Sequence, residues 1–301
     1  MKHTAAYYLL DVFTNQPFGG NPLAVFPDAN DLSSSEMQSL TKELNLSESV
    51  FILPAENQTA DVKMRIFTPG KELPTAGHPT IGTSFLLLNE GLIKTKNRNK
   101  IILEQNIGNI HVNYRMEGNV IRHLMMEQPL PKFEETFSDR ALIAALLSIE
   151  AGEIEEDYPC RIVNCGNPFL IVPIKSLKTM SRLKLNNELY HQILEEVDII
   201  GIMAFSLETT SPFVLTHSRM FAPQIGVPED PATGSAHGPL AAYIFNYQMG
   251  DVTKLVQGEQ GIEMGRPSFI DMQIVTDEAK ISSVQVGGES VIMGKGEIRF
   301  R

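Results

Sequence analysis

Short apolar runs, many of them alternating with polar residues, follow one another over most of the chain, a pattern typical of β-strands. Gly, Asn and Pro, which favour turns, bound these runs. In the first half they predict strands at Tyr8–Phe13, Leu23–Phe26, Ser49–Leu53, Asp61–Phe67, Lys100–Gln105, Ile110–Met116 and Val120–Glu127. We therefore expect a protein that consists mainly of sheet.

Two helix-like segments interrupt the strands of the first half. The segment Ser35–Leu44 follows the capping-box pattern Ser33-x-x-Glu36 and is apolar on one face, which predicts a surface helix. The segment Thr80–Asn89 has almost no polar face, and Pro79 is expected at its first position. A helix that is apolar all round has to be enclosed by the rest of the fold.

The second half contains a similar apolar segment, Leu240–Phe245, preceded by Pro239. Further helices are expected near Asp139–Ser148 and Asn187–Glu196, on the outside. The pattern thus favours an α+β fold in which each half is a curved, largely antiparallel sheet wrapped around one buried central helix.

An internal repeat supports this division into halves. Four elements recur in the same order, 146 to 157 positions apart by their numbering. The pairs are Gly20-Asn21-Pro22-Leu23 with Gly166-Asn167-Pro168-Phe169, Arg65-Ile66-Phe67-Thr68-Pro69 with Arg219-Met220-Phe221-Ala222-Pro223, Glu72-x-Pro74-x-x-Gly77 with Glu229-x-Pro231-x-x-Gly234, and the apolar segment that follows each. Such a repeat indicates two related, pseudo-symmetric domains.

We place the domain boundary in the segment Glu127–Phe133, which gives an N-terminal half of residues 1–128 and a C-terminal half of residues 129–301. The last predicted strand, Ser290–Phe300, could cross back to the first half. The length of 301 residues suits two domains, each with a core of its own.

Composition narrows the functional classes. The net charge of −11, without any block of Lys or Arg, argues against a nucleic-acid surface, because phosphate binding needs clustered cations. No run approaches the roughly 20 apolar residues of a membrane span. The N-terminal segment does not resemble a signal peptide. We therefore expect a cytoplasmic protein that binds neither nucleic acid nor membrane.

The two cysteines, Cys160 and Cys165, have no companion ligand at metal-binding spacing and are interpreted as reduced core thiols. We expect no metal site. The sequence also lacks the Gly-x-Ser-x-Gly, Gly-x-x-x-x-Gly-Lys-Ser/Thr and Gly-x-Gly-x-x-Gly patterns, so no motif implies a cofactor.

The candidate chemistry lies where the two enclosed helices start. The turns at Gly77 and Gly234 should leave the first amide N–H groups of each helix free, and such a helix start favours an anion. If a pseudo-two-fold axis relates the halves, both helix starts can face one cleft and hold a carboxylate together. The site is thus expected to bind a small carboxylate-bearing substrate.

Three side chains are candidates for proton transfer. Glu48 enters a buried strand, where partial loss of solvent makes a carboxylate a better proton acceptor near neutrality. Asp230 is interpreted as its counterpart in the second half, and His78 could donate to substrate or shuttle a proton. Each also has a structural interpretation. Glu48 could be a solvent-exposed turn residue, Asp230 could cap the helix or form the turn, and His78 could be a structural histidine bonded to a carbonyl. Glu72 and Glu229 are expected to anchor the turns.

Several segments together carry a resemblance to a known family. They are Asp11-Val12-Phe13, Gly20-Asn21-Pro22-Leu23-Ala24-Val25, Asn45-Leu46-Ser47-Glu48-Ser49, Arg65-Ile66-Phe67-Thr68-Pro69, Glu72-Leu73-Pro74-Thr75-Ala76-Gly77-His78-Pro79 and Glu229-Asp230-Pro231-Ala232-Thr233-Gly234-Ser235-Ala236. From Tyr8 to Phe300 the chain resembles the PhzF-like isomerases of phenazine biosynthesis. That resemblance implies the diaminopimelate epimerase fold, proton transfer without a cofactor, and a homodimer.

The resemblance also implies roles for particular residues. Glu48 becomes the general base or acid, with His78, Asp230 and Ser235 as polar companions. The amides of Gly77 and Gly234 bind the anion, and Asn21 lines the cleft. Thiol-dependent epimerases of the same fold carry a cysteine at each helix start, which this chain lacks, and we interpret Cys165 as unrelated to the reaction.

Three functions stay open at this point. The first is a cofactor-independent isomerase that moves a proton on a small carboxylate. The second is an amino-acid racemase or epimerase with Glu48 and Asp230 as two bases on opposite faces of one carbon. The third is a non-catalytic protein that binds small acids. The sequence does not identify the physiological substrate.

Overall fold

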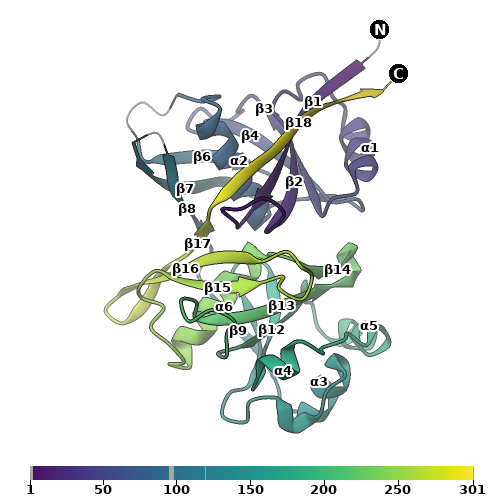
Figure 1. Ribbon diagram of the computed structural model, residues 1–301, viewed down its shortest axis with the longest axis vertical. Helices are drawn as coiled ribbons and strands as arrows, with labels where there is room; N and C mark the ends of the chain where they lie inside the picture. The colour runs from purple at the N-terminus through teal and green to yellow at the C-terminus, as the bar shows by residue number, and fades with distance from the viewer. Residues whose placement is uncertain (1–2, 95–97, 119, 301) are drawn as a thin grey trace. The chain divides into compact units, whose positions relative to one another are not determined.

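The computed structural model describes residues 3–94, 98–118 and 120–300. The chain divides into two units, the first formed by Met1–Glu127 with Gly287–Arg301 and the second by Gln128–Val286 (Figure 1). Each unit is built on a mixed sheet with a helix packed against it, and the two are described separately below.

The sheet of the first unit has the strand order β18, β1, β2, β3, β4, β6, β7, β8. The pairs β2–β3 and β4–β6 are parallel and the others are antiparallel, and β5 adds to β4. The strands are β1 (His3–Val12), β2 (Asn21–Phe26), β3 (Glu48–Leu53), β4 (Val62–Phe67), β5 (Glu72–Leu73), β6 (Lys100–Gln105), β7 (Gly108–Glu117), β8 (Val120–Gln128) and β18 (Ser290–Phe300).

The second unit repeats this arrangement with the order β9, β10, β11, β12, β13, β15, β16. Here β11–β12 and β13–β15 are the parallel pairs, and β14 adds to β13. The strands are β9 (Lys132–Phe137), β10 (Cys160–Asn164), β11 (Pro168–Pro173), β12 (Gly201–Ser206), β13 (Thr216–Ala222), β14 (Val227–Asp230), β15 (Val256–Gln260), β16 (Ser268–Asp277) and β17 (Lys280–Gly288).

The matching registers identify equivalent residues. In the first parallel pair Leu23 lies opposite Glu48, and in the second unit Phe169 lies opposite Gly201. Since Leu23 and Phe169 hold the same place in the repeated Gly-Asn-Pro element, Gly201 is the structural counterpart of Glu48.

The central helices are α2 (Gly77–Asn89) in the first unit and α6 (Gly234–Asn246) in the second. Helix α2 contacts β1, β2, β3, β7 and β18, and α6 contacts β10, β11 and β16. Almost every residue of their first two turns is buried. The expectation of an enclosed helix against each sheet is confirmed.

The helix starts expected from the apolar segments and their prolines were wrong, whereas the expectation that each helix begins at the turn containing Gly77 or Gly234 is confirmed. Helix α2 begins two residues before Pro79, and α6 begins five residues before Pro239, which lies inside the helix. At the third position of α2 the missing N–H of proline would have had no intrahelical partner. The helical geometry therefore extends back to the glycines themselves, and the repeated turns lead directly into the first amides.

The other helices lie on the opposite face of each sheet (Figure 1). In the first unit α1 (Ser34–Leu44) packs Met37 and Leu40 against Phe26 and Phe51, and its capping box at Ser33 is confirmed. In the second unit an apolar cluster joins α3 and α5 to strands β10, β11 and β12. The remaining helical segments are α3 (Arg140–Leu147), α4 (Leu177–Met180), α5 (Asn187–Glu196) and the 3₁₀ turns η1 (Ala151–Glu153) and η2 (Pro223–Ile225).

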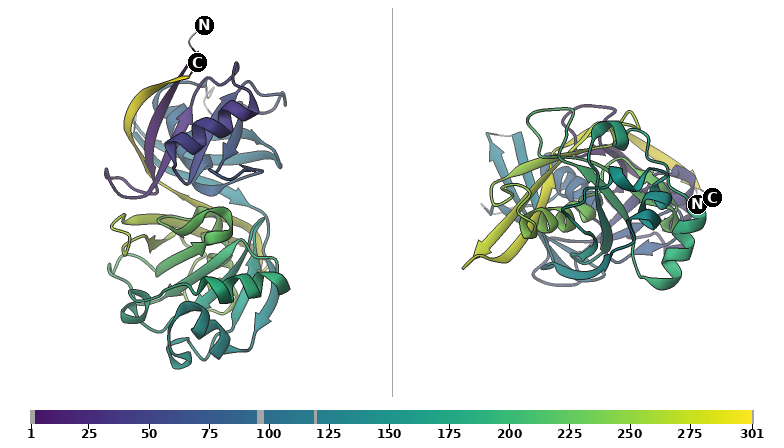
Figure 2. Two further views of the ribbon diagram at one scale, coloured as in Figure 1. Left: turned by 90° about the vertical axis from the view of Figure 1, so that its right-hand side faces the viewer. Right: turned by 90° about the horizontal axis from the view of Figure 1, so that it is seen from below.

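The first and last strands of the chain are neighbours. Strand β18 pairs with β1 along nearly its whole length, from Ser290 opposite Val12 to Phe300 opposite His3. The first and last described residues, His3 and Phe300, consequently lie side by side (Figure 2).

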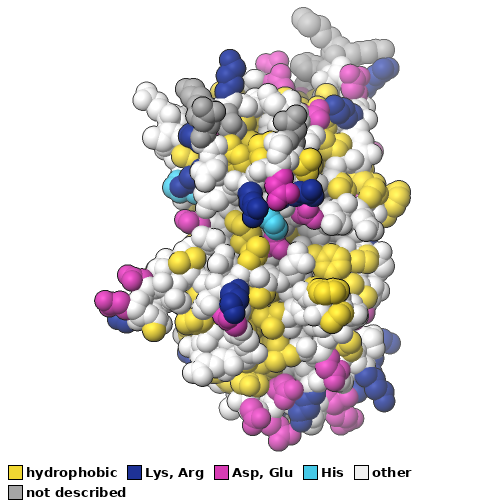
Figure 3. Space-filling view, turned by 60° about the vertical axis from the view of Figure 1, so that its left-hand side comes forward, with side chains coloured by type: hydrophobic (Ala, Val, Ile, Leu, Met, Phe, Trp, Pro, Cys, Tyr) yellow, Lys and Arg dark blue, Asp and Glu magenta, His cyan; other side chains and the backbone are white. Residues whose placement is uncertain are grey.

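On the face drawn in Figure 3 a few charged side chains of both signs are scattered among hydrophobic and uncharged ones. Within the described residues, no helix combines the length and apolar character that a membrane span requires.

The close packing at Gly201 makes a first prediction. A Cβ atom there would lie 2.7 Å from the carbonyl oxygen of Phe221, which is backbone and cannot easily move, whereas a Cβ at Gly152 meets nothing within 4 Å. Gly201→Ala should lower the free energy of unfolding by about 1–3 kcal/mol through overpacking. Urea denaturation measures this loss, and Gly152→Ala serves as the control. Equal stabilities for the two variants would contradict the packing argument.

Candidate active site

The two central helices differ from the other helices in how they begin. Helices α1, α3, α4 and α5 each start with a side chain that accepts a hydrogen bond from a first-turn amide, namely Ser33, Asp139, Ser176 and Asn186. At α2 and α6 the cap residues Ala76 and Thr233 make no such bond, and the first turns carry no acidic residue. The amides that normally receive a cap are therefore available to an anionic ligand.

A buried glutamine holds the turn before α2. The amide Nε2 of Gln105, at the end of β6, donates to Oγ1 of Thr80 at 2.7 Å, and its Oε1 accepts from Oγ1 of Thr75 at 2.6 Å. Thr80 in turn donates to the carbonyl oxygen of Ala76 at 2.6 Å. One side chain thus braces both sides of the helix start.

The second unit uses the same device. Gln260, at the end of β15, donates from Nε2 to the carbonyl oxygen of Asp230 at 2.6 Å and to Oγ1 of Thr233 at 3.0 Å. Its Oε1 accepts from the backbone N–H of Thr233 at 3.2 Å. The hydroxyl of Thr233 donates to Oδ2 of Asp230 at 2.6 Å and so does not cap the helix.

Sequence analysis did not identify these glutamines, although a signal for them is present. Glu104-Gln105 and Glu259-Gln260 form a further matched pair, 155 positions apart, close to the spacing of the other repeat elements. A two-residue match attracts little notice by itself. Its meaning depends on the position of the glutamine at the end of the strand beside the helix start.

Glu72 and Glu229 anchor the turns through arginine, in agreement with their predicted structural role. Arg65 binds Glu72 through Nε at 2.8 Å and Nη2 at 2.6 Å, and Arg219 binds Glu229 in the same way at 2.7 and 2.8 Å. The hydrogen bond from Arg65 holds the pKa of Glu72 below its usual value. Each guanidinium also lies over the phenylalanine two residues further along its strand.

In the first unit Glu48, His78 and Gly77 come together. Glu48 is the first residue of β3, with 13% of its side chain exposed, and Nε2 of the buried His78 lies 3.4 Å from its Oε2. This nitrogen forms no hydrogen bond with any described residue, so the contact is a close approach only. Burial lowers the pKa of His78 to about 3, which favours the neutral imidazole over an ion pair with Glu48.

Asn21 occupies the start of the neighbouring strand β2 and is fully buried. Its Oδ1 accepts a hydrogen bond from Oγ of Ser47, the residue before Glu48, at 2.9 Å. This bond fixes the segment that delivers Glu48 to the end of the sheet, within the same unit as α2.

In the second unit Asp230, Gly234 and Ser235 lie on one turn. Asp230 is buried at the end of β14, and Ser235 is the half-buried second residue of α6. The interpretation of Asp230 as the counterpart of Glu48 is wrong by register, because Gly201 holds that position. By the repeated Glu-x-Pro motif Asp230 corresponds to Leu73, and Ser235 corresponds to His78.

The two cysteines, Cys160 and Cys165, are free thiols. Both are buried and unpaired, and burial raises the pKa of the Cys160 thiol to about 11 and that of Cys165 to about 12. Such thiols react poorly, since the thiolate is the nucleophile. Among the described residues no cluster of three or more His, Cys, Asp or Glu side chains is arranged to hold a metal ion.

The two sheets and their central helices define a fold class. Two like-built units, each with a sheet around a helix whose first amides are uncapped, form a diaminopimelate epimerase-like protein. Solved structures of this class include a hydroxyproline epimerase from Agrobacterium vitis, with a TM-score of 0.66 at 10% identity, covering 98% of this chain and 92% of that one. At that identity the likeness concerns the fold alone.

The chain belongs to the PhzC-PhzF family of phenazine biosynthesis-like proteins, whose model matches residues 10–296. It is 33% identical to a trans-2,3-dihydro-3-hydroxyanthranilate isomerase from Pseudomonas chlororaphis, covering 97% of this chain and 98% of that protein. A PhzF-family structure from Bacillus anthracis has a TM-score of 0.90 at 29% identity and covers 98% of this chain and 99% of its own. The predicted family and fold are thereby confirmed, and the chain is an isomerase of this family.

The duplicated arginine pairs differ in burial, which yields a second prediction. Arg219, with 8% of its side chain exposed, also donates to the carbonyl oxygens of Met180 and Leu183, whereas Arg65 is 20% exposed. Arg219→Lys keeps the charge but cannot satisfy all these acceptors, so unfolding free energy should fall by about 1–3 kcal/mol. Arg65→Lys should cost less than about 1 kcal/mol. Thermal and urea unfolding of the two variants compare them directly, and a larger loss for Arg65→Lys would contradict this ranking.

Proposed function

We propose that this isomerase moves a proton within a small carboxylate substrate without a cofactor, and that Glu48 is the group that carries the proton. The observation behind the proposal is the pair formed by Glu48 and His78 beside the uncapped start of α2. A partly exposed carboxylate lies 3.4 Å from a neutral, buried imidazole nitrogen that has no hydrogen bond to a described residue.

The chemistry follows from the states of these two groups. Ionised Glu48 takes a proton from a substrate carbon, the C–H bond breaks, and its electrons pass into an enol-like system. The protonated Glu48 then returns the proton to a different carbon of the same substrate. Atoms and charge balance without an added oxidant, reductant or metal. A neutral His78 can donate or accept one hydrogen bond throughout the cycle.

The helix starts supply the binding groups of the proposal. We assign the binding of the substrate carboxylate to the amides at Gly77, in the unit that holds Glu48, since the partial positive charge of a helix start favours an anion. The start of α6 at Gly234 offers amides of the same kind in its own unit. Ser235 and Asn21 contribute polar groups, and Asp230, fixed by Thr233, orients the substrate. Gln105 stabilises the turn before α2 and Gln260 stabilises the turn before α6, and neither takes part in the reaction.

The asymmetry between the units favours an isomerase over a two-base racemase. The second unit has Gly201 where the first has Glu48, and a Cβ atom there would lie 2.7 Å from a backbone oxygen. A carboxylate cannot occupy the equivalent position without rearrangement of β13. We therefore assign proton transfer to Glu48 and an orienting role to Asp230.

The resemblance to PhzF-like isomerases leads us to propose further that the protein is a cytoplasmic homodimer. Analytical ultracentrifugation tests the assembly: a sedimentation coefficient of a monomer of 33.4 kDa at micromolar concentration would argue against the dimer.

Removal of the proton carrier makes a third prediction. Glu48→Gln keeps the size and hydrogen bonding of the side chain, so turnover should fall by roughly 10²–10⁴-fold with little change in substrate binding. Solvent-deuterium incorporation into trans-2,3-dihydro-3-hydroxyanthranilate, and into a panel of small cyclic and amino acids, measures the exchange. The exposed Glu56 gives the matched control Glu56→Gln, which should be as active as the wild type. A folded Glu48→Gln protein with normal turnover would refute the assignment.

A fourth prediction separates the two enzyme classes. Asp230→Asn should reduce turnover clearly less than Glu48→Gln if Asp230 only orients the substrate. The two losses should be equal if the enzyme is a two-base racemase. The product's configuration, read by chiral chromatography, provides an independent measurement. Equal losses together with inversion at a single carbon would replace our proposal by the racemase.

A further inference from the structure

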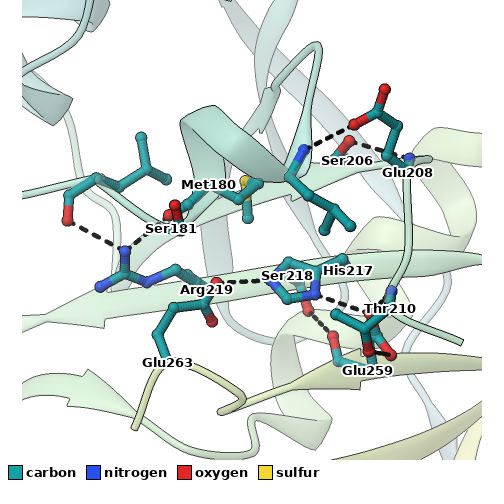
Figure 4. Close-up of polar contacts among 12 residues, drawn as sticks. Met180, Ser181, Ser206, Glu208, Thr210, His217, Ser218, Arg219, Glu259 and Glu263 are labelled. Carbon is teal, nitrogen blue, oxygen red and sulfur yellow. Dashed lines mark hydrogen bonds and ion pairs between the residues drawn. The ribbon is translucent and has the colours of Figure 1, made fainter.

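A buried histidine of the second unit lies between two carboxylates and has no part in the chemistry proposed above. His217, on β13, is 1% exposed; its Nδ1 is 2.8 Å from Oε1 of Glu259 and its Nε2 is 2.9 Å from Oε1 of Glu263 (Figure 4). Glu259 is fully buried on β15, and Glu263 has 16% of its side chain exposed. The ring thus bridges the strand and the turn that follows it.

This geometry requires a charged imidazole. Both ring nitrogens face carboxylate oxygens, and only imidazolium has two N–H donors. Burial is the strongest single influence and opposes protonation, but the hydrogen bonds to Glu259 and Glu263 together outweigh it and raise the pKa of His217 to about 9. The same contacts hold the pKa values of both glutamates below their usual value, although burial acts in the opposite direction.

Groups on three neighbouring elements also lie close to these carboxylates. From the segment before β13, Thr210 donates its backbone N–H and its hydroxyl to Glu259 at 2.6 and 2.7 Å. On β13, Arg219 contributes a favourable electrostatic interaction to Glu263 while paired with Glu229. On α6, His237 approaches the neighbouring Gly258, but burial lowers its pKa to about 4 and it is uncharged.

The two carboxylates flank the residues that shape the start of α6. Between them lie Gln260, which holds Asp230 and Thr233, and Gly261. A Cβ atom at Gly261 would lie 2.5 Å from the carbonyl oxygen of Pro231, so this turn packs directly on the Asp230–Thr233 segment. A shift of Glu259 or Glu263 would therefore act on the segment that leads into α6.

We propose that His217 is a positioning residue for the candidate site: its imidazolium clamps Glu259 and Glu263 on either side of Gln260 and Gly261, and so sets the turn that presents the amides of α6. The link to substrate binding rests on the function proposed above. The clamp itself is a property of the second unit alone.

The clamp makes the turn sensitive to alkaline pH. Because the pKa of His217 is raised from 6.5 to about 9, its stabilising contribution is complete below about pH 6.5 and is lost as pH rises through about 9. Loss of the proton leaves two carboxylates close together without the cation between them. The pKa values of Glu259 and Glu263 are lowered. The stability that these two carboxylates contribute is therefore present above their ordinary pKa and is lost only in more acidic solution.

The experiment is a pH titration of the wild-type protein by NMR, followed through the side chain of His217 and the backbone amides of Thr233 and Gly234. We expect both amide signals to shift with the midpoint of His217, near pH 9. Amides that do not respond while His217 titrates would overturn the proposal, whatever the enzyme's activity. This measurement needs no substitution and does not depend on the proposed reaction.

Variants extend the test to binding. His217→Gln removes the cation, and KM should rise several-fold at pH 7 with a smaller effect on kcat. His217→Arg supplies a permanent cation, and should restore KM and abolish its rise above pH 9. The exposed His191 gives the control His191→Gln, with wild-type KM at every pH. If KM of the His217→Arg variant still rises above pH 9, the proposal is overturned. If Glu48→Gln is fully active while the amides follow His217, the proposed function fails and the clamp stands.

Discussion

A helix enclosed by its own domain must begin inside the protein, where its first amides cannot turn to water. This constraint dominates both units. The amides of α2 and α6 receive no side-chain cap, whereas every other α-helix in the described part of the chain has one. A buried donor without an acceptor costs free energy comparable to a lost hydrogen bond. A rigidly held turn with uncapped amides can offset this cost by binding an anion.

The residues that hold each turn rigid are the same in both units. Each turn has a glutamine at the end of the adjacent strand and an arginine–glutamate pair before the helix. These parts are neutral or internally paired, so they brace the backbone without competing for the anion. The residues proposed for proton transfer differ between the units: Gly201 and Ser235 occupy the positions of Glu48 and His78 in the second unit. Both units therefore keep the same scaffold, while the proposed proton carrier is present in the first unit only.

The sequence predicts a large part of this architecture for physical reasons. Apolar residues all round Thr80–Asn89 require enclosure, and a repeat in fixed order requires two similar domains. The apolar segments and their prolines placed the helix starts too late, because proline at the first position is only a statistical preference. Both helices begin at the glycines instead. His217 could not be found in this way. Its partner Glu259 lies 42 residues further on, and only the parallel pairing of β13 with β15 brings the two opposite each other. The roles of Asp230 and Ser235 likewise depend on the turn that Gln260 holds.

The pairing of β18 with β1 has a consequence for biosynthesis. A ribosome completes the strands β1 to β8 well before β18, which is made after the whole second unit. During that interval β1 keeps an unpaired edge, and an open edge is where nascent chains associate wrongly. The second unit, by contrast, is continuous in sequence and can fold as soon as it leaves the exit tunnel. The half that carries Glu48 is thus synthesised first and finished last.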